Sequence, residues 1–304
     1  MMSQYDHLLD KAFDLLDATK EERIDYVNRD KWIGYPRAQQ IIERMEDFIT
    51  YPKVERMPNL LIVGDSNNGK TQILKRFADR YPLIVDEEDY TNRQPVVFIS
   101  APAKPDENAF LIRVLEEMIV PYAKNDSLEV KRQKVIRNME CRETRMLIID
   151  EIQHIIAGSY NAQKGFLNSI KDLCNALRIP IVGAGIEDSF HAIQVDPQMA
   201  NRFQIEVLER WPFDSKESRK AFAQLIMTIE SRLPLPEPSL LYKKPFIEQL
   251  YYLSEGLIGE LVLIIKQLAV YAIRHDLPCI DDSVFGALNL IPASKRKDLL
   301  KRIR

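Results

Sequence analysis

The stretch Gly64-Asp65-Ser66-Asn67-Asn68-Gly69-Lys70-Thr71 decides the fold of this chain. It fits the pattern G-x-x-x-x-G-K-[ST] without a gap, and it follows the short apolar run NLLIVG (59–64). It also opens a segment in which Ile73, Leu74 and Phe77 recur at helical spacing. Glycines let a backbone bend around phosphate groups, and consecutive N–H groups at a helix N-terminus attract negative charge. The stretch therefore predicts a phosphate-binding loop between a buried strand and a helix.

The side chains of this loop have distinct expected roles. Lys70 is expected to face the β- and γ-phosphates, and the Thr71 hydroxyl is expected to hold Mg²⁺. No Asn-Lys-x-Asp guanine reader occurs in the sequence, which favours ATP over GTP. The residues expected to contact the nucleotide through this loop are Gly64, Asp65, Ser66, Asn67, Asn68, Gly69, Lys70, Thr71 and Gln72.

A second sequence pattern, a pair of adjacent carboxylates, belongs to the same chemistry. The apolar run RMLIIDE (145–151) ends in two carboxylates, and we expect Asp150 to hold Mg²⁺ and Glu151 to activate the attacking water. Acidic residues also end many buried strands at an exposed edge, but the phosphate loop makes that the lesser alternative. Arg202 precedes the last strand, where an arginine finger would reach the γ-phosphate of a neighbouring subunit. The alternative for Arg202 is a surface arginine at a helix end.

Apolar runs alternate with helical periodicity along the first two thirds of the chain. We expect strands at 59–64, 95–101, 145–151, 179–185 and 203–210. Such runs predict an α/β fold, a three-layer αβα domain with a five-stranded parallel sheet, followed by a smaller all-helical lid domain. The expected domains are a helical segment at 1–30, whose first helix runs up to the charged stretch 20–23, the P-loop ATPase domain at 31–212, the lid at 213–292 and a basic tail at 293–304.

Composition sets limits on partners and location. Lys and Arg total 42 against 45 for Asp and Glu, so DNA binding would need a local patch. Cys141, Cys174 and Cys279 lack metal or disulfide spacing. No uncharged apolar run reaches membrane-spanning length, and the first twenty residues predict an amphipathic helix rather than a signal sequence. We expect a cytoplasmic protein with no membrane partner.

Weaker signals supply further candidate residues. Lys104, Lys124, Lys131 and Arg132 are candidates for contacts with a DNA backbone, against the alternative of a solvated helix face. Ile33 and Tyr35 are candidates for an adenine pocket, against the alternative of aromatic and aliphatic packing on the first helix.

Four segments together resemble a known family, TniB, the ATPase of certain DNA transposons. They are RDKWIGYPRAQQ (29–40), MPNLLIVGDSNNGKT (57–71), FISAPAKPDE (98–107) and LIIDEIQHI (147–155). TniB is similar to TnsC and MuB, AAA+ regulators that assemble with ATP on double-stranded DNA. The resemblance implies an AAA+ fold and a head-to-tail homo-oligomer, as a ring or a filament. It also implies target-site marking, disassembly driven by ATP hydrolysis, and two protein partners, a DDE transposase and a TniQ-like adaptor.

Two positions depart from the usual AAA+ pattern. The fourth strand ends in Gly183-Ala184-Gly185, where a polar sensor residue is usual, and Glu260 stands near the expected place of a sensor arginine. Slow, regulatory turnover is therefore expected. Two other functions stay open: a helicase loader or replication-initiation ATPase, which would work with a helicase, and a signalling ATPase that oligomerises without nucleic acid.

Overall fold

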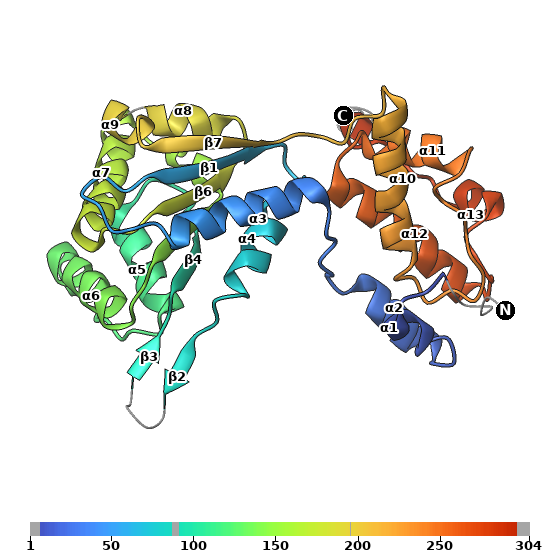
Figure 1. The fold of residues 1–304 in the computed structure, drawn as a ribbon, viewed down its shortest axis with the longest axis horizontal. Coiled ribbons are helices and arrows are strands. Elements are labelled where there is room, and N and C mark those ends of the chain that lie inside the picture. Colours follow the sequence, from blue (N-terminus) through green and yellow to red (C-terminus); the bar gives the residue numbers. More distant parts are fainter. Residues whose placement is uncertain (1–6, 87–90, 195, 297–304) are drawn as a thin grey trace. The chain divides into compact units, whose positions relative to one another are not determined.

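The computed structural model describes residues 7–86, 91–194 and 196–296, and these form two compact units (Figure 1). One unit is the continuous segment Pro36–Glu209. The other joins the chain before Pro36 to the chain after Glu209. No helix among the described residues is long and apolar enough to cross a membrane.

The Pro36–Glu209 unit is built around a parallel sheet with the strand order β4-β5-β6-β1-β7. This confirms the predicted five-stranded parallel sheet, and each strand lies within a run that the sequence indicated. The strands are β1 (Asn59–Gly64), β4 (Val96–Ser100), β5 (Met146–Asp150), β6 (Ile181–Gly185) and β7 (Phe203–Leu208). The order places β1 between β6 and β7, so the loop that follows β1 lies at the carboxyl end of an interior strand and not of an edge strand.

Helices cover both faces of this sheet, which makes the unit a three-layer αβα domain (Figure 1). The helical elements are α3 (Pro36–Ile49), α4 (Lys70–Ala78), α5 (Glu107–Glu117), α6 (Leu128–Cys141), the 3₁₀ turn η1 (Ile152–Ala157), α7 (Tyr160–Leu177), α8 (Asp188–Gln194) and α9 (Pro197–Ala200). Pro36 begins α3 because a proline at the first helical position has no hydrogen bond to lose.

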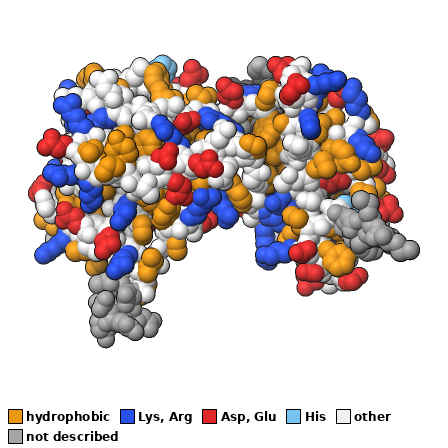
Figure 2. All heavy atoms as spheres, in the orientation of Figure 1, with side chains coloured by type: hydrophobic (Ala, Val, Ile, Leu, Met, Phe, Trp, Pro, Cys, Tyr) orange, Lys and Arg blue, Asp and Glu red, His pale blue; other side chains and the backbone are white. Residues whose placement is uncertain are grey.

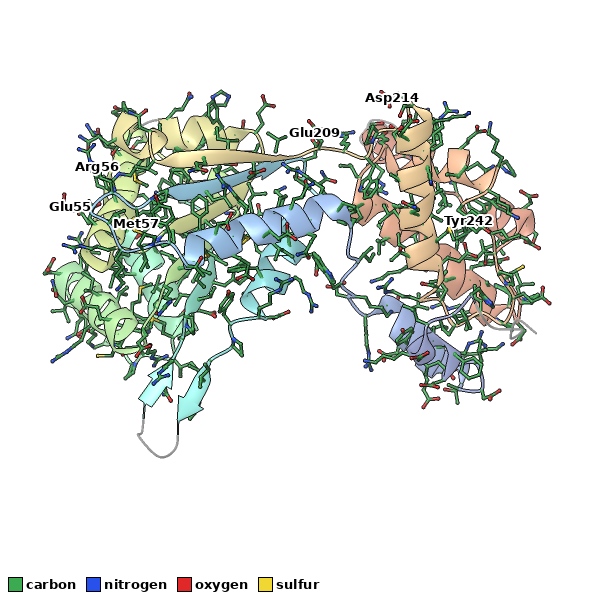
Figure 3. The ribbon with its side chains drawn as sticks, viewed as in Figure 1. Glu55, Arg56, Met57, Glu209, Asp214 and Tyr242 are labelled. Carbon is green, nitrogen blue, oxygen red and sulfur yellow. The ribbon has the colours of Figure 1, made fainter. Side chains whose placement is uncertain are left out.

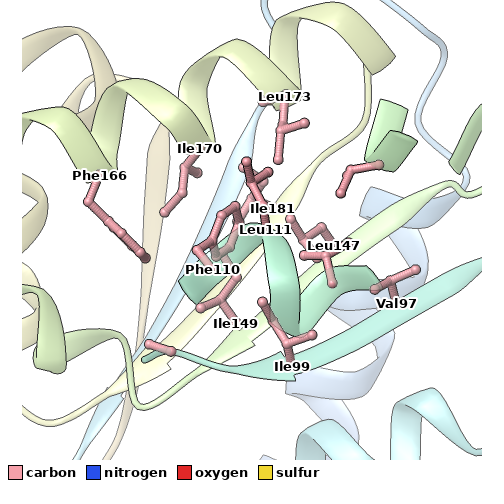
Figure 4. Packing of buried hydrophobic residues seen from close by; sticks show 14 of the residues in the cluster. Val97, Ile99, Phe110, Leu111, Leu147, Ile149, Phe166, Ile170, Leu173 and Ile181 are labelled. Atoms are coloured by element: carbon pink, nitrogen blue, oxygen red, sulfur yellow. The ribbon is translucent and has the colours of Figure 1, made fainter. Parts of the chain in front are cut away.

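Helices α5 and α7 bury their apolar stripes against the sheet (Figure 4). Phe110 of α5 and Phe166 of α7 meet edge to face with ring centroids 5.2 Å apart, and both are buried in one cluster with Ile149. Burial of one such side chain contributes about 1.5–3 kcal/mol. The carboxyl end of β5, which carries the acidic pair, is thus held by a packed core.

A short hairpin in this unit was absent from the prediction. Strands β2 (Ile84–Asp86) and β3 (Thr91–Arg93) pair in antiparallel fashion as a separate sheet. Each has only three residues, too few for an alternating pattern to stand out in the sequence.

The predicted first helix is wrong at its carboxyl end. Helix α1 (Asp10–Phe13) is short, and the charged stretch begins α2 (Lys20–Asn28) instead of ending α1. Thr19 caps α2 through a reciprocal pair, because its side chain accepts from Glu22 N at 3.3 Å and its own N donates to Glu22 Oε2 at 3.0 Å. The spacing Thr-x-x-Glu is a helix start signal that outweighs the continuing helical pattern.

The second unit is all-helical, and its core includes the amino-terminal segment. Its helices beyond α1 and α2 are α10 (Lys216–Glu230), α11 (Phe246–Ser254), α12 (Ile258–Arg274) and α13 (Asp282–Ala287). Val27 of α2 is 1% exposed, in one apolar cluster with Phe222 of α10 and Leu261 of α12.

The domain boundaries therefore differ from the expected ones. The described residues before Pro36 pack with the helical unit, whereas the predicted domains set 1–30 apart and gave 31–35 to the ATPase domain. Of the expected tail at 293–304, residues 297–304 lie outside the described residues.

Candidate nucleotide site

The loop between β1 and α4 has the backbone geometry of a phosphate cradle. Asn67 and Gly69 both adopt left-handed conformations, with φ of 61° and 89°, and Gly69 is the N-cap of α4. Asparagine and glycine are the residues that tolerate this region, and alternation of backbone hand turns successive N–H groups toward one concave side. The loop predicted from the sequence is thus shaped to face an anion at the start of α4.

Two contacts fasten this loop to the neighbouring strand. Asn68 is 1% exposed, and its Nδ2 donates to Leu208 O at 2.8 Å and Glu209 O at 3.0 Å. A Cβ on Gly64 would lie 2.6 Å from Leu208 O, so only glycine lets the end of β1 pass this close to β7. The Asn68 side chain therefore anchors the loop, while its backbone remains part of the cradle.

Lys70 is buried at the centre of the loop. The residue is 7% exposed, and its Nζ donates to Gly64 O at 2.9 Å and Asp65 O at 2.8 Å. Burial lowers the pKa of Lys70, while the carboxylates of Glu151 and Asp150 act in the opposite direction. The cation is held where phosphate oxygens of a nucleotide in the loop would accept its hydrogen bonds.

Thr71 and Asp150 bring two side-chain oxygens together from different elements. Thr71 is in the first turn of α4, Asp150 ends β5, and Thr71 Oγ1 donates to Asp150 Oδ2 at 2.6 Å. Among the described residues no group of three His, Cys, Asp or Glu side chains is placed to hold a metal ion. Mg²⁺ bound together with phosphates needs only one or two protein oxygens, so the pair fits that ion. The fit supports the predicted metal ligands Thr71 and Asp150.

Glu151 follows β5 in a left-handed conformation, with φ 56° and ψ 37°. Its N–H donates to Asp150 Oδ1 at 2.9 Å, and its carboxylate accepts a short hydrogen bond from Gln153 Nε2. A left-handed backbone at a residue other than glycine costs of the order of 1–3 kcal/mol and is concentrated at functional sites. The turn puts the second carboxylate close enough to Lys70 to act on its pKa. Sequence reasoning missed Gln153, which carries no motif of its own.

Arg202 lies at the amino-terminal ends of the sheet strands, whereas the loop lies at their carboxyl ends. Its carbonyl accepts from Asn59 N at 2.8 Å at the start of β1, and its Nη1 donates to Asn175 Oδ1 at 2.7 Å. The six residues of β1 span about 16 Å between this end and the loop. In Figure 3, Arg56 and Met57, which share a cavity with Arg202, mark one end of these strands, and Glu209 marks the loop end. Arg202 is thus out of reach of the phosphate loop of its own subunit.

The four basic candidates occupy different environments. Lys104 and Lys124 are exposed in loops before α5 and α6. Lys131 is 2% exposed with Nζ donating to Asp126 O at 2.7 Å, and Arg132 forms a short ion pair with Glu107. The structure therefore differs from the expectation of a solvated basic face: Lys131 is buried, and Arg132 is half-buried and paired with a carboxylate of the same unit. Figure 2 shows acidic and basic side chains interspersed over each unit on the face it presents.

The remaining candidates belong to the helical unit. Ile33 and Tyr35 pack against its core, and the Tyr35 and Trp211 rings lie 5.3 Å apart, so their adenine role stays a prediction. Glu260, in the first turn of α12, is 6% exposed and pairs with Arg296 Nη1 at 3.2 Å. The acidic residue at the expected sensor position thus has a structural partner.

Comparison with known proteins gives a family and a set of folds. A family model described as Bacterial TniB protein matches residues 23–213, which is more than half of the chain. No curated protein matches the sequence closely enough to count as similar.

Several solved structures are similar to this chain. The ORC2 protein of Aeropyrum pernix, in ADPNP and ADP complexes, is 12% identical with a TM-score of 0.61 and matches over 85% of this chain and 69% of that one. The ORC1 protein of the same organism, in complex with DNA, is 14% identical with a TM-score of 0.60 over 87% and 68%. Domain III of the replication initiation protein DnaA from Thermotoga maritima is 20% identical with a TM-score of 0.51 over 88% and 92%. At these identities the likeness establishes the fold alone, an α/β domain with a helical domain.

Proposed function

This chain belongs to the TniB family, and from that premise we propose that it is an AAA+ ATPase that assembles on double-stranded DNA with ATP and marks the target of a transposase. The observation that carries the ATPase part is the meeting of Thr71 with Asp150 beside Lys70. The transposition part rests on the family. Its partners would be a DDE transposase and a TniQ-like adaptor, with hydrolysis driving disassembly.

The proposed chemistry assigns one task to each side chain around the loop. Lys70 binds the β- and γ-phosphate oxygens, while the N–H groups of the loop and of α4 hold the phosphates in line for attack. Mg²⁺ held by Thr71 and Asp150 would neutralise charge that develops on the phosphates. Glu151 takes the proton of the attacking water, a task for which a carboxylate beside the phosphates is suited.

The position of Arg202 supports the proposal of a nucleotide site that a second subunit completes. Because Arg202 and the phosphate loop lie at opposite ends of the sheet strands, the Arg202 guanidinium would act on the γ-phosphate of a neighbouring subunit. Such a contact joins unlike surfaces of identical chains, so it repeats head to tail and generates a ring or an open helix. ATP would then stabilise each junction, which makes assembly depend on nucleotide.

We expect Arg202→Ala to retain ATP binding and to lose at least about 100-fold in hydrolysis, because an arginine finger is worth about 10³–10⁵ in the rate of related enzymes. Mixing it with Lys70→Ala should restore part of the activity, since some junctions then combine an intact loop with an intact arginine. Arg145→Ala is the matched control, because Arg145 is an exposed arginine that also directly precedes a strand of the same sheet. Mixed oligomers without any recovery of phosphate release would show that Arg202 is structural.

DNA contact is proposed for Lys104 and Lys124, the two exposed candidates. Replacement of both by alanine should weaken binding to unrelated duplexes about equally. It should also flatten the slope of log affinity against log salt by about one for each lysine that contacts a phosphate. Lys75→Ala, an exposed lysine of α4, is the control. An unchanged salt slope in anisotropy titrations would reject these two residues as phosphate contacts.

The likeness to a domain of a replication initiation protein supports one alternative, a helicase loader or initiator ATPase. The neighbouring reading frames separate the two: transposase genes beside this one favour the proposal, and a helicase gene alone favours the alternative. A signalling ATPase would bind no DNA in the titrations above.

A further inference from the structure

The end of β6 lacks a polar side chain of its own, yet a polar group occupies that place. A Cβ on Gly185 would lie 2.2 Å from Gln153 Oε1 and 2.5 Å from Ser189 Oγ. Contacts this short are essentially never made by real Cβ atoms. The carboxamide of Gln153, which comes from η1, therefore fills the space beside β6 that a side chain at position 185 would take, and such a side chain would have to displace it.

The hydrogen bonds of Gln153 fix the direction of its amide. Ile186 N donates to Gln153 Oε1 at 3.4 Å, and Gln153 Nε2 donates to Glu151 Oε2. A backbone N–H can only donate, and an ionised carboxylate can only accept. A reversed amide would therefore place Nε2 against the Ile186 N–H and Oε1 against the Glu151 carboxylate. One side chain thus connects the backbone after β6 to the carboxylate that follows β5.

The backbone of Glu151 is also fixed on its other side. Its N–H donates to Asp150 Oδ1 at 2.9 Å, and its φ of 56° directs the residue away from the strand. With the backbone held by Asp150 and the carboxylate held by Gln153, the side chain has little freedom to rotate. A carboxylate accepts through either oxygen, so the bond to Gln153 leaves the group chemically able to take a proton.

We propose that Gln153 is the positioning residue for Glu151, and that its carboxamide supplies from η1 the polar group that the Gly183-Ala184-Gly185 strand end lacks. The inference rests on the proposed role of Glu151 as the base that activates water. A general base misplaced by about 1 Å loses of the order of 100-fold in rate, so a group that fixes the base affects turnover without touching the nucleotide.

The first test is Gln153→Ala. We expect kcat for ATP hydrolysis to fall about 10- to 100-fold. This is the range found when the hydrogen-bond partners that orient metal-ligating side chains are removed. KM for ATP and the affinity for a non-hydrolysable ATP analogue should stay within about twofold of the parent, because Lys70 and Thr71 are untouched. Gln163→Ala is the matched control, since the Gln163 amide donates to the Ile156 and Gly158 carbonyls, and its kcat should not change.

The second test uses coupling between variants. Gly185→Ala forces the carboxamide aside and should lower kcat in the parent, but it should add much less when Gln153 is already alanine. In a Glu151→Gln background, Gln153→Ala should cause no further loss in single-turnover hydrolysis. Gly165→Ala, at a helical glycine with open space around its Cβ, controls for the substitution itself.

The outcomes separate this inference from the proposed function. A Gln153→Ala chain with unchanged or increased kcat, or one whose loss appears equally in the Glu151→Gln background, overturns the positioning role. A Glu151→Gln chain that hydrolyses ATP like the parent instead overturns the assignment of the base, whatever Gln153→Ala does.

Discussion

Lys70→Ala is expected to abolish ATP binding and, with it, every ATP-dependent property of the chain. Lys70 is 7% exposed, and its ammonium lies at the centre of the loop, where it donates to Gly64 O and Asp65 O. With ATP bound, the substitution would remove two or more charge-assisted hydrogen bonds from this ammonium to phosphate. At about 1.5–3 kcal/mol each, the dissociation constant should rise by about 100-fold or more. Titration with a fluorescent ATP analogue measures this directly.

The matched control is Lys75→Ala, at an exposed lysine further along the same helix, which should bind the analogue like the parent. DNA binding of both variants should be measured with and without nucleotide. If Lys70→Ala binds ATP and DNA as the parent does, the nucleotide site lies elsewhere.

Glu151→Gln is expected to separate binding from hydrolysis. The change keeps Thr71 and Asp150 together and keeps the shape of the side chain, but it removes the carboxylate that takes the proton. Hydrolysis should fall by about 10²–10⁴-fold, the usual contribution of a general base, while affinity for ATP is retained. Complexes with DNA should then persist after excess competitor is added.

The control for this variant is Glu187→Gln, at an exposed glutamate just before α8, which should release phosphate at the parent rate. Phosphate release and the lifetime of DNA complexes are measured on the same samples. Normal hydrolysis by Glu151→Gln would move the base to another residue, and short-lived complexes without hydrolysis would disconnect turnover from disassembly.

The sequence predicted the sheet and the phosphate loop well because their signals are local and strong. A parallel strand buried on both faces reads as a short apolar run. The loop needs glycine at Gly64 and Gly69 for reasons that the structure makes explicit, a close approach to Leu208 and a left-handed N-cap. Asp150 and Glu151 could be predicted because they come at the end of an apolar strand, and in the structure that strand ends beside the loop.

The basic patch was predicted less well, although the sequence carried a signal against it. Lys131, Val135 and Met139 follow one another at helical spacing of four, and all three are buried on the inner stripe of α6. A lysine in an apolar stripe can bury its stem and satisfy its ammonium locally, here on Asp126 O. The prediction counted the charges without assigning each to a face of the helix, so it expected Lys131 at the surface, whereas the residue is buried.

Gln153 shows a different limit of the sequence. Its role depends on Gly185, Ile186 and Glu151, which come together only when η1 packs beside β6. The glycine in β6 indicated an absent sensor, and the structure shows that the same glycine makes room for a side chain from elsewhere. A residue whose partners are distant in sequence gives no motif.

If ATP causes this chain to assemble head to tail on DNA, electron microscopy of the purified chain with duplex DNA will show it most directly. With a non-hydrolysable ATP analogue, we predict rings or helical filaments on the duplex in which Arg202 of each subunit faces the phosphate loop of the next. Without nucleotide, or with Lys70→Ala, the duplex should remain bare. Single subunits on DNA in the presence of the analogue, or the same assemblies in its absence, would contradict the account.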